Sequence, residues 1–353
     1  MTEETAARRV PIEQLRGFIE RAFTAVGMPA EDARTVASLM AEADALGSEG
    51  HGVFRLPQYV KRIRAGGVNL RPDIRIERER AGMALLDGDN AMGHLVMHRA
   101  AELATLKAAE AGVAWVGAHH SNHAGPASLY ARVPLRDGMI GLYVAVGNAN
   151  HLPPWGGTEL LLSTNPIAIA VPAATRPPLV LDMATTVAAY GKVKTKAQRG
   201  ETMPEGWMID RQGRPLTDPR RADQGFLLPI GGYKGYGLGL MFGILAGILN
   251  GAAFGRDTID FNADLVSPTN TGQFVVAIDI GAFIDPEAFK GQIDVVWDTM
   301  KSSPLLPGFD EIRLPGERTH RIEQENRARG VPVHPALERT LAELAAGLAI
   351  EPL

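Results

Sequence analysis

His51 and Arg55 lie four residues apart in the run Gly50-His51-Gly52-Val53-Phe54-Arg55, which opens an apolar-periodic segment. An imidazole exchanges a proton near neutral pH, and a guanidinium binds a carboxylate through two parallel hydrogen bonds. On one helical turn, side chains four residues apart project from the same face. The pair therefore has the chemistry to bind a small carboxylic acid and move a proton at its neighbouring carbon. A solvated helix face is the alternative interpretation.

A second group of histidines lies in the run His119-His120-Ser121-Asn122-His123. His119 and His123 have the spacing of a zinc-binding helical pair, but no glutamate stands between them and a predicted strand precedes them. No nearby carboxylate or cysteine completes a ligand set, so we predict no metal site. A structural or solvated cluster is one alternative. The favoured one is a catalytic or cofactor role for His123, in a loop at a strand end where open α/β sheets bind ligands.

Residues 227–237 are typical of a strand, a glycine loop and a helix. The glycine spacing is not that of the G-x-G-x-x-G dinucleotide fingerprint, so a Rossmann site is not supported. Lys234 at the helix start can still bind a phosphate, because backbone N–H groups and the helix dipole attract anions. Thr164 and Asp182 follow apolar runs and suit hydrogen bonding to hydroxyls or amides, and Asp182 to a ribose hydroxyl. Ordinary turn residues explain all three equally well.

The bulk composition narrows the class of protein. The 353 residues are 45% hydrophobic and 22% charged with a net charge of −4, which is typical of a globular protein of two lobes. No basic cluster is long enough to follow a phosphate backbone, so nucleic acid is not an expected partner. The absence of cysteine excludes disulfides and thiolate chemistry. The acidic start Met1-Thr2-Glu3-Glu4 has no apolar run of a secretory signal, so we expect a cytoplasmic enzyme.

Hydrophobic periodicity predicts an α/β chain in which helices cover a central sheet. Helices are expected at about 15–26, 36–46, 56–63, 94–111, 286–300, 317–329 and 335–348. Short apolar runs predict strands at 84–86, 113–116, 140–146, 167–171, 179–181 and 274–278. We therefore predict a central sheet lobe at residues 81–299 and a mainly helical lobe built from both chain ends, residues 1–80 plus 300–353.

Residues 235–254 carry no charge over 20 positions, a length that could span a bilayer. Glycine is frequent there, and five glycines recur at every fourth position from 235 to 251. That spacing draws a groove where another backbone can approach closely, both in membrane helix pairs and in soluble cores. No second span is visible, so we predict a buried core helix and no membrane association.

Taken together and in order, these motifs resemble the type-2 malate/L-lactate dehydrogenase family. That family also includes sulfolactate, ureidoglycolate and diketogulonate oxidoreductases and cyclic-imine carboxylate reductases. The resemblance runs from about residue 10 to 330. Its motifs are Gly50-His51-Gly52-Val53-Phe54-Arg55-Leu56-Pro57, Ser121-Asn122-His123, Ser163-Thr164-Asn165-Pro166-Ile167-Ala168, Leu181-Asp182-Met183-Ala184-Thr185, Pro204-Glu205-Gly206-Trp207 and Gly231-Gly232-Tyr233-Lys234-Gly235-Tyr236-Gly237.

The resemblance implies hydride transfer with NAD or NADP on a non-Rossmann fold, in a homodimer whose active site lies between lobes near the subunit boundary. His51 would exchange a proton with the substrate oxygen or nitrogen. Arg55 would hold the carboxylate, and Thr164 would contact the substrate. In some family members the histidine at the position of His123 is assigned as the proton acceptor. The residues implied in cofactor binding are His123, Ala124, Gly125, Asp182, Met183, Ala184, Lys234, Arg313 and Gly316.

The sequence departs from the family pattern at Gly50, where the family usually has serine. A serine hydroxyl there can hydrogen-bond the histidine or the substrate, so its loss puts a serine-assisted relay and the usual substrates in question. The choice between NAD and NADP stays open, because the acidic and basic candidates are mixed: Asp182, Lys192, Lys194 and Arg313.

The leading hypothesis is a cytoplasmic NAD(P)-dependent oxidoreductase of a small 2-hydroxy acid, with reduction of a cyclic 2-imino acid as the alternative. A metal-dependent hydrolase using His119 and His123 is a rival from another class. A non-catalytic carboxylate-binding paralogue is the other rival, suggested by Gly50.

Overall fold

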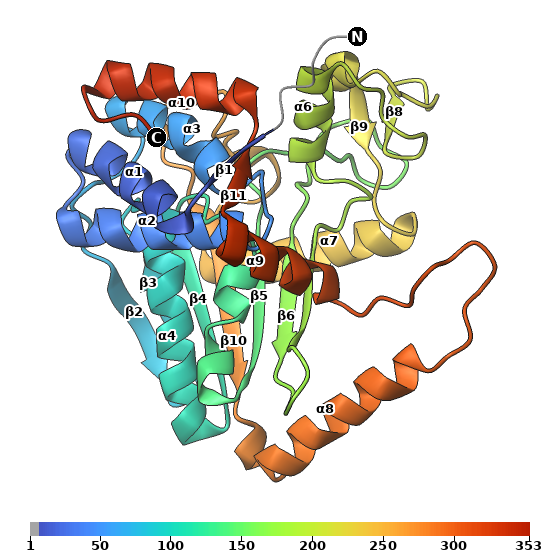
Figure 1. The fold of residues 1–353 in the computed structure, drawn as a ribbon. Coiled ribbons are helices and arrows are strands. Elements are labelled where there is room, and N and C mark those ends of the chain that lie inside the picture. Colours follow the sequence, from blue (N-terminus) through green and yellow to red (C-terminus); the bar gives the residue numbers. More distant parts are fainter. Residues whose placement is uncertain (1–6) are drawn as a thin grey trace.

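Helices from both ends of the chain form one lobe in the computed structural model, which describes residues 7–353. The acidic start at residues 1–4 lies outside the described residues. Figure 1 shows the blue N-terminal helices beside the red C-terminal ones. The elements are β1 (Arg8–Val10), α1 (Ile12–Ala25), α2 (Ala30–Ala45), η1 (Val53–Arg55), α3 (Leu56–Arg64), α9 (Glu317–Arg329), β11 (Val331–Val333) and α10 (Pro335–Leu348).

The two chain ends share one hydrophobic core. Phe18 and Phe23 of α1 are fully buried in the same cluster as Val331 of β11 and Leu341 of α10. β1 pairs antiparallel with β11, which fixes the two termini to each other. The helical lobe predicted from both ends is therefore confirmed, and the short β1–β11 pair is an addition that periodicity could not predict.

A seven-stranded mixed sheet forms the centre, in the order β2-β3-β4-β10-β5-β6-β7. Only β3 and β4 pair in parallel; the other neighbours are antiparallel. The strands are β2 (Arg75–Arg80), β3 (Met83–Asp87), β4 (Val113–Ser121), β5 (Ile140–Ala145), β6 (Ile167–Val171), β7 (Leu179–Met183) and β10 (Thr271–Ile278). All the predicted strands are present. β2, with the sequence RIERER, lacks the apolar run that would have predicted it.

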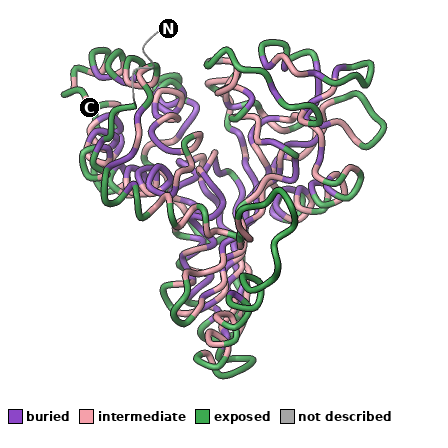
Figure 2. The backbone as a smooth tube through the Cα atoms, turned by 45° about the vertical axis from the view of Figure 1, so that its right-hand side comes forward, coloured by how far each residue is buried: buried purple, intermediate pink, exposed green. Residues whose placement is uncertain are grey.

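Helices cover both faces of this sheet, as the predicted fold class requires. α4 (Gly93–Ala111) packs its alanine-rich face on β3, β4 and β10, and α5 (Ser128–Ala131) lies against β5. α7 (Tyr233–Ala246) packs on β5 and β10 from the other side. In Figure 2 the buried stretches run through the helical lobe and the sheet. The division of the chain at residues 80 and 300 stays a prediction.

The prediction of a buried core helix at residues 235–254 was wrong in two respects, since α7 ends at Ala246 and one of its faces is exposed. The buried residues of α7 are Gly235, Gly239, Gly243 and Ala246, whereas Leu238 and Met241 are exposed. The glycine groove faces inward because it lets the helix approach Thr185 and Asn165 closely. No helix among the described residues is long and apolar enough to cross a membrane.

Two further parts project from the sheet lobe. α6 (Tyr190–Arg199) and the hairpin of β8 (Met208–Asp210) and β9 (Gly225–Leu227) share a small apolar core of their own. α8 (Pro286–Lys301) extends from the lower end of the molecule, followed by a long loop (Figure 1). α6 lies next to the helical lobe at Arg55, since a Cβ on Gly191 would stand 4.0 Å from a terminal nitrogen of Arg55.

Candidate active site

His51 lies in a turn before η1, not on the helix that carries Arg55. Gly52 has a ψ of −134°, which no helix contains, so the expected single helical turn with both side chains is corrected. The cause is Asp44, a buried carboxylate on α2 whose Oδ2 accepts a hydrogen bond from the N–H of Val53 at 2.7 Å. A Cβ on Gly52 would stand 2.0 Å from the Asp44 carboxylate, so only glycine fits there.

Asp44 therefore positions the turn between the two predicted site residues. In the sequence it is only an acid on an apolar helix face. Burial raises the pKa of Asp44 to about 8, against the opposing effect of its hydrogen bond to Val53. Burial disfavours the charged form of a carboxyl group, so Asp44 stays protonated up to a higher pH than an exposed aspartate does.

The rings of His51 and His123 are stacked in parallel, with centroids 5.7 Å apart and planes 4° from each other. The ring of His123 also stacks on Phe261, with centroids 5.0 Å apart. The Oγ of Ser48 lies 3.3 Å from Nδ1 of His51. Gly50 lacks the hydroxyl of the family serine, but Ser48, two residues earlier, places a hydroxyl beside His51.

Tyr59, on α3, hydrogen-bonds Nδ1 of His123 at 2.5 Å. The backbone N–H of Gly125 also donates to this Nδ1, at 3.4 Å. A backbone N–H can only donate, so Nδ1 is the acceptor and the neutral ring carries its proton on Nε2. This tautomer makes His123 a hydrogen-bond donor at Nε2.

His94, at the start of α4, completes the group as a fully buried ring set edge-on to Tyr59 at 5.5 Å. Neither of its ring nitrogens has a hydrogen-bond partner within the described residues. Tyr59 and His94 were not predicted as site residues. Tyr59 follows Arg55 at the spacing of one helical turn, a signal that could have indicated it.

These three histidines are held neutral. Burial lowers the pKa of His51 to about 4, and the Arg55 cation adds to the effect. Burial, with a smaller contribution from His51, lowers the pKa of His94 to about 3. The pKa of His123 is also lowered, by burial first and then by Arg55. Among residues 7–353, the histidines that pair with carboxylates are His98, His119 and His120.

Arg55 is held beside Phe261, the ring on which His123 stacks, by three contacts. Its Nε donates to the carbonyl oxygen of Gly50 at 2.8 Å, and its guanidinium lies 5.5 Å from the ring centroid of Phe261. One terminal nitrogen donates to Oδ1 of Asn262 at 3.4 Å. Arg55 makes no ion pair with a carboxylate of the described chain, so its charge is available to an acidic ligand.

The structure separates His119 from His123. Nε2 of His119 donates to Oε2 of Glu77 at 2.9 Å, and Nδ1 of His120 lies 3.0 Å from Oδ1 of Asp87. Asp87, His119 and His120 are close enough together to hold a metal ion, but Arg75 already pairs with Asp87 at 2.6 Å. His119 and His123 belong to no common ligand cluster among residues 7–353, so the geometry lacks the metal pair that the hydrolase hypothesis requires.

The predicted cofactor segments adjoin one another. The backbone N–H of Ser128, just after the loop with His123, Ala124 and Gly125, donates to Oδ2 of Asp182 at 3.0 Å. Met183 ends β7 and Ala184 follows it, and both are partly exposed.

Thr185, the residue after Ala184, connects these cofactor segments to two other predicted positions, Thr164 and Lys234. The N–H and the hydroxyl of Thr185 both donate to the carbonyl oxygen of Thr164, at 2.9 Å. The carbonyl oxygen of Thr185 accepts from the N–H of Ile230, four residues before Lys234. Lys234 is exposed on the first turn of α7.

The two C-terminal candidates differ in their surroundings. Gly316 packs on β7, where a Cβ would lie 2.9 Å from the nitrogen of Val180. Arg313 is exposed and pairs with Glu311 at 2.5 Å. Only Gly316 is thus in direct contact with the strand that carries Asp182.

The chemistry of these segments fits a nicotinamide dinucleotide. Gly231 and Gly232 both have positive φ and precede a 14-residue helix that no side chain caps, so the first-turn amides and Lys234 suit a diphosphate. The Asp182 carboxylate suits a ribose hydroxyl. The loop that contains His123 adjoins these segments. The Nε2–H of His123 is a hydrogen-bond donor fixed close to Arg55.

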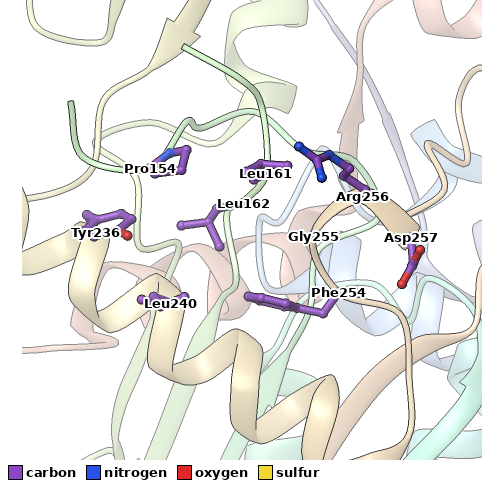
Figure 3. A pocket seen from close by; sticks show the side chains of 9 residues that line it. All are labelled: Pro154, Leu161, Leu162, Tyr236, Leu240, Phe254, Gly255, Arg256 and Asp257. Carbon is purple, nitrogen blue, oxygen red and sulfur yellow. The ribbon is translucent and has the colours of Figure 1, made fainter. Parts of the chain in front are cut away.

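A cavity of a different kind lies away from these histidines. It measures about 500 Å³ and is lined mainly by apolar side chains, among them Tyr236 and Leu240 of α7 and Phe254 (Figure 3). No histidine lines it. We therefore place the chemistry at the His51–His123 pair.

Comparison with known proteins agrees with this geometry. Residues 10–342 match the family model described as malate/L-lactate dehydrogenase. The chain is 40% identical to malate dehydrogenase of Pyrococcus horikoshii over 98% of this chain and 97% of that one. It is 34% identical to ureidoglycolate dehydrogenase (NAD(+)) of Escherichia coli O157:H7, over 92% of each chain. The solved structure of malate dehydrogenase from P. horikoshii OT3 superposes with a TM-score of 0.90 at 38% identity, covering 98% and 97% of the two chains.

A non-Rossmann α/β fold with paired histidines and a free arginine defines an oxidoreductase that acts on small acids, and the match extends over almost the whole chain. The chain belongs to the malate/L-lactate dehydrogenase family. The predicted family, fold class and enzyme class are confirmed. The roles of single residues stay predictions.

Proposed function

We propose that this protein is an NAD(P)-dependent dehydrogenase of a 2-hydroxy acid and that His51 moves the proton. The observation that carries the proposal is the stack of His51 on His123 beside Arg55, which joins residues 51–55 to the loop that follows β4. Bound nicotinamide supplies the acceptor or donor of the hydride.

Arg55 binds the substrate carboxylate, because its guanidinium is partly buried and has no ion-pair partner of its own in residues 7–353. The neutral His51 ring accepts the proton of the 2-hydroxyl group during oxidation. His123 donates a hydrogen bond from Nε2 to the same oxygen and stabilises negative charge there, because Tyr59 and Gly125 fix its tautomer. Reduction uses the same groups in the opposite direction.

Ser48 takes the positioning role that the family gives to the serine before the histidine. Its Oγ contacts Nδ1 of His51, so the opposite nitrogen, Nε2, is left for the substrate. Thr164 lies beside the predicted cofactor segments, because its carbonyl oxygen accepts from Thr185. We propose that it contacts the substrate or the nicotinamide amide. The relay therefore survives the exchange of the family serine for Gly50.

We further propose NAD as the cofactor, since the similar ureidoglycolate dehydrogenase is named for NAD(+) and Asp182 suits an unphosphorylated ribose. Asp182, Met183, Ala184, Gly316 and the loop at Ala124 and Gly125 would hold it, with Lys234 at the diphosphate. Arg313 is less well placed, because it already pairs with Glu311.

A homodimer is proposed from the exposed apolar side chains of α7, η4 (Ile248–Asn250) and α8. Soluble monomers rarely expose such a set together. The set is Tyr233, Leu238, Met241, Ile248, Leu249, Val295, Val296 and Met300. The proposed location is the cytoplasm.

The test is the absorbance of NADH and NADPH at 340 nm with purified protein and a panel of 2-oxo acids and cyclic imines. The proposal expects oxidation of NADH, with a 2-oxo acid, that depends on substrate concentration. Turnover of a cyclic imine alone would move the protein to the reductase branch of the family. Folded protein that is silent with both cofactors would overturn the proposed function and favour a binding role.

A further inference from the structure

The rings of His119 and His120 lie side by side although the two residues are neighbours on one strand, β4. Successive side chains of a regular strand point to opposite faces of the sheet, yet the two ring centroids are only 4.3 Å apart. A β-bulge explains this arrangement, because the register with β10 shifts so that both histidines oppose a single residue, Gly272. His120 has a φ of 47°, a conformation that costs free energy for a residue with a side chain. The bulge therefore re-aims one imidazole toward the other.

Two carboxylates on the neighbouring strands face this histidine pair. Asp87 ends β3 directly opposite His119, and its Oδ1 lies 3.0 Å from Nδ1 of His120. Glu77 of β2 accepts a hydrogen bond from Nε2 of His119 through Oε2, at 2.9 Å. The pairing of β2 with β3 also shifts in register at Glu77, which is the extra residue of a second bulge. Bulges on two strands thus direct side chains into one cluster.

The cluster has the ligands of a transition-metal site. Asp87, His119 and His120 each offer one ligand atom, and these three atoms lie within 4.8 Å of one another. Imidazole nitrogen combined with carboxylate oxygen is a ligand set of Zn²⁺ and similar divalent ions, whereas Mg²⁺ and Ca²⁺ prefer oxygen alone. Asp87 and His119 are buried and His120 is half exposed, so an ion can reach the cluster from solvent. Glu77 stands beside His119, either to orient its ring or to serve as a fourth ligand.

Arg75 already contacts Asp87, but at the other carboxylate oxygen. Its guanidinium donates to Oδ2 at 2.6 Å, whereas His120 lies at Oδ1. The backbone N–H of Asp89 donates to Oδ1 at 2.9 Å and fixes the carboxylate further. Carboxylates that bind a metal are usually held by such hydrogen bonds. Arg75 and the N–H of Asp89 therefore orient Asp87, although the positive charge of Arg75 weakens the attraction for a cation.

The turn after β3 holds the backbone of both histidines. The N–H of Gly88 donates to the carbonyl oxygen of His119 at 2.9 Å, and the N–H of Asn90 donates to that of His120 at 2.8 Å. The N–H of His120 donates to Oδ1 of Asn270 at 2.7 Å. These hydrogen bonds involve no ion, so the binding of an ion requires little further ordering of the chain.

We propose that Asp87, His119 and His120, with Glu77 beside them, bind a divalent transition-metal ion of the Zn²⁺ type. Such an ion connects β2, β3 and β4 at the edge of the sheet and stabilises the exposed strand β2. The site is separate from the proposed dehydrogenase site, since His123 takes no part in it. The ion therefore contributes to stability and not to hydride transfer.

The experiment measures Zn²⁺ binding by isothermal titration calorimetry on the full chain without a polyhistidine tag, after metals have been removed with EDTA. Wild type is expected to bind Zn²⁺ and to melt at a higher temperature with it, because a ligand that binds the folded state stabilises that state. In His120→Gln the dissociation constant is expected to rise at least about tenfold, because even the loss of a group that only contacts a metal ligand has an effect of this size. Asp87→Asn keeps the shape of the side chain but removes its charge, and it is expected to weaken binding as much.

His98→Gln is the matched control. His98 also faces a carboxylate, that of Glu102 at 3.2 Å, but it belongs to no ligand cluster among the described residues. This variant is expected to keep the wild-type dissociation constant. Absence of Zn²⁺ binding by the wild type would overturn the proposal. Dissociation constants that are equal in wild type, His120→Gln and Asp87→Asn would also overturn it, because the ion would then lie elsewhere in the chain. Circular dichroism and melting without metal show that each variant is folded.

Discussion

Two histidine clusters lie at opposite ends of one short run, and their environments differ completely. His123 stacks with both His51 and Phe261, and no carboxylate of the described chain pairs with this stack. His119 and His120, at the end of β4, contact Glu77 and Asp87 at the sheet edge. The residue type is the same in both clusters, and only the partners differ.

The contrast shows how the fold assigns a function to an imidazole. A buried ring that has a cation but no carboxylate beside it stays neutral and keeps one nitrogen free for a substrate. A ring beside a carboxylate is instead used in a hydrogen-bonded pair, which suits structure at a sheet edge. The spacing of His119 and His123 in the sequence carries none of this information.

The difference between the two clusters is tested most strongly by His51→Gln, with His120→Gln as the matched control. We expect kcat to fall about 10²- to 10⁴-fold in the first variant, because the group that moves the proton is lost. The control should remain within about threefold of the wild type. Steady-state kinetics and calorimetric NADH binding measure both effects, and nucleotide binding should be unchanged. Near-normal kcat in His51→Gln would remove this residue from proton transfer.

Arg55→Lys tests whether the Arg55 guanidinium, beside the stack of His51 and His123, binds a carboxylate through two hydrogen bonds. A lysine keeps the charge but cannot reproduce the fork of the guanidinium or its hydrogen bond to Gly50. We expect KM for the 2-oxo acid to rise about 30- to 100-fold with a smaller change in kcat. An unchanged KM would contradict carboxylate binding by Arg55.

The neutral cluster also predicts how stability depends on pH. The pKa of buried His94 is lowered to about 3, below that of histidine in the unfolded chain. Its stabilising contribution is complete above about pH 6.5 and is lost as the pH falls toward the folded value, because the unfolded chain binds the proton first. We expect a slope of about 1.4 kcal/mol per pH unit for each such histidine.

Urea unfolding at pH 7 and pH 5 measures this slope, and His94→Gln should reduce it by about one proton. A slope that does not change in this variant would show that His94 titrates alike in the folded and unfolded states.

The smallest expected effect concerns Ser48 and Gly50. Ser48→Ala removes the hydroxyl beside His51 and should lower kcat about three- to tenfold. Gly50→Ser restores the family serine, and a Cβ on Gly50 would meet nothing within 4 Å, so it should fold normally. If it rescues kcat in the Ser48→Ala background, the two hydroxyls are interchangeable. Equal kcat in Ser48→Ala and wild type would remove Ser48 from the relay.

Local pattern predicted most of the fold but only part of the site. The periodicity of a helix or strand depends on residues close together in the sequence, so α9 and β6 were expected with their observed bounds. β2 is a charged edge strand, and the β1–β11 pair joins residues more than 300 positions apart, so neither has a local signal.

The site shows the same limit. The motifs gave His51, Arg55 and His123, but Phe261 and Asn262 reach the site only through tertiary contacts. Lys194 was weighed only for the choice of cofactor, because nothing near it in the chain indicates that it lies beside Asn262.

The central claim is that His51 is a neutral ring, without a carboxylate partner in residues 7–353, that is free to accept a proton. An NMR titration of ¹³C-labelled histidine, with His51→Gln to assign the resonance, tests this claim most directly. We predict that the His51 ring protonates only near pH 4, and that it is neutral at pH 6. A His51 resonance that titrates at or above pH 6.5 would contradict the account.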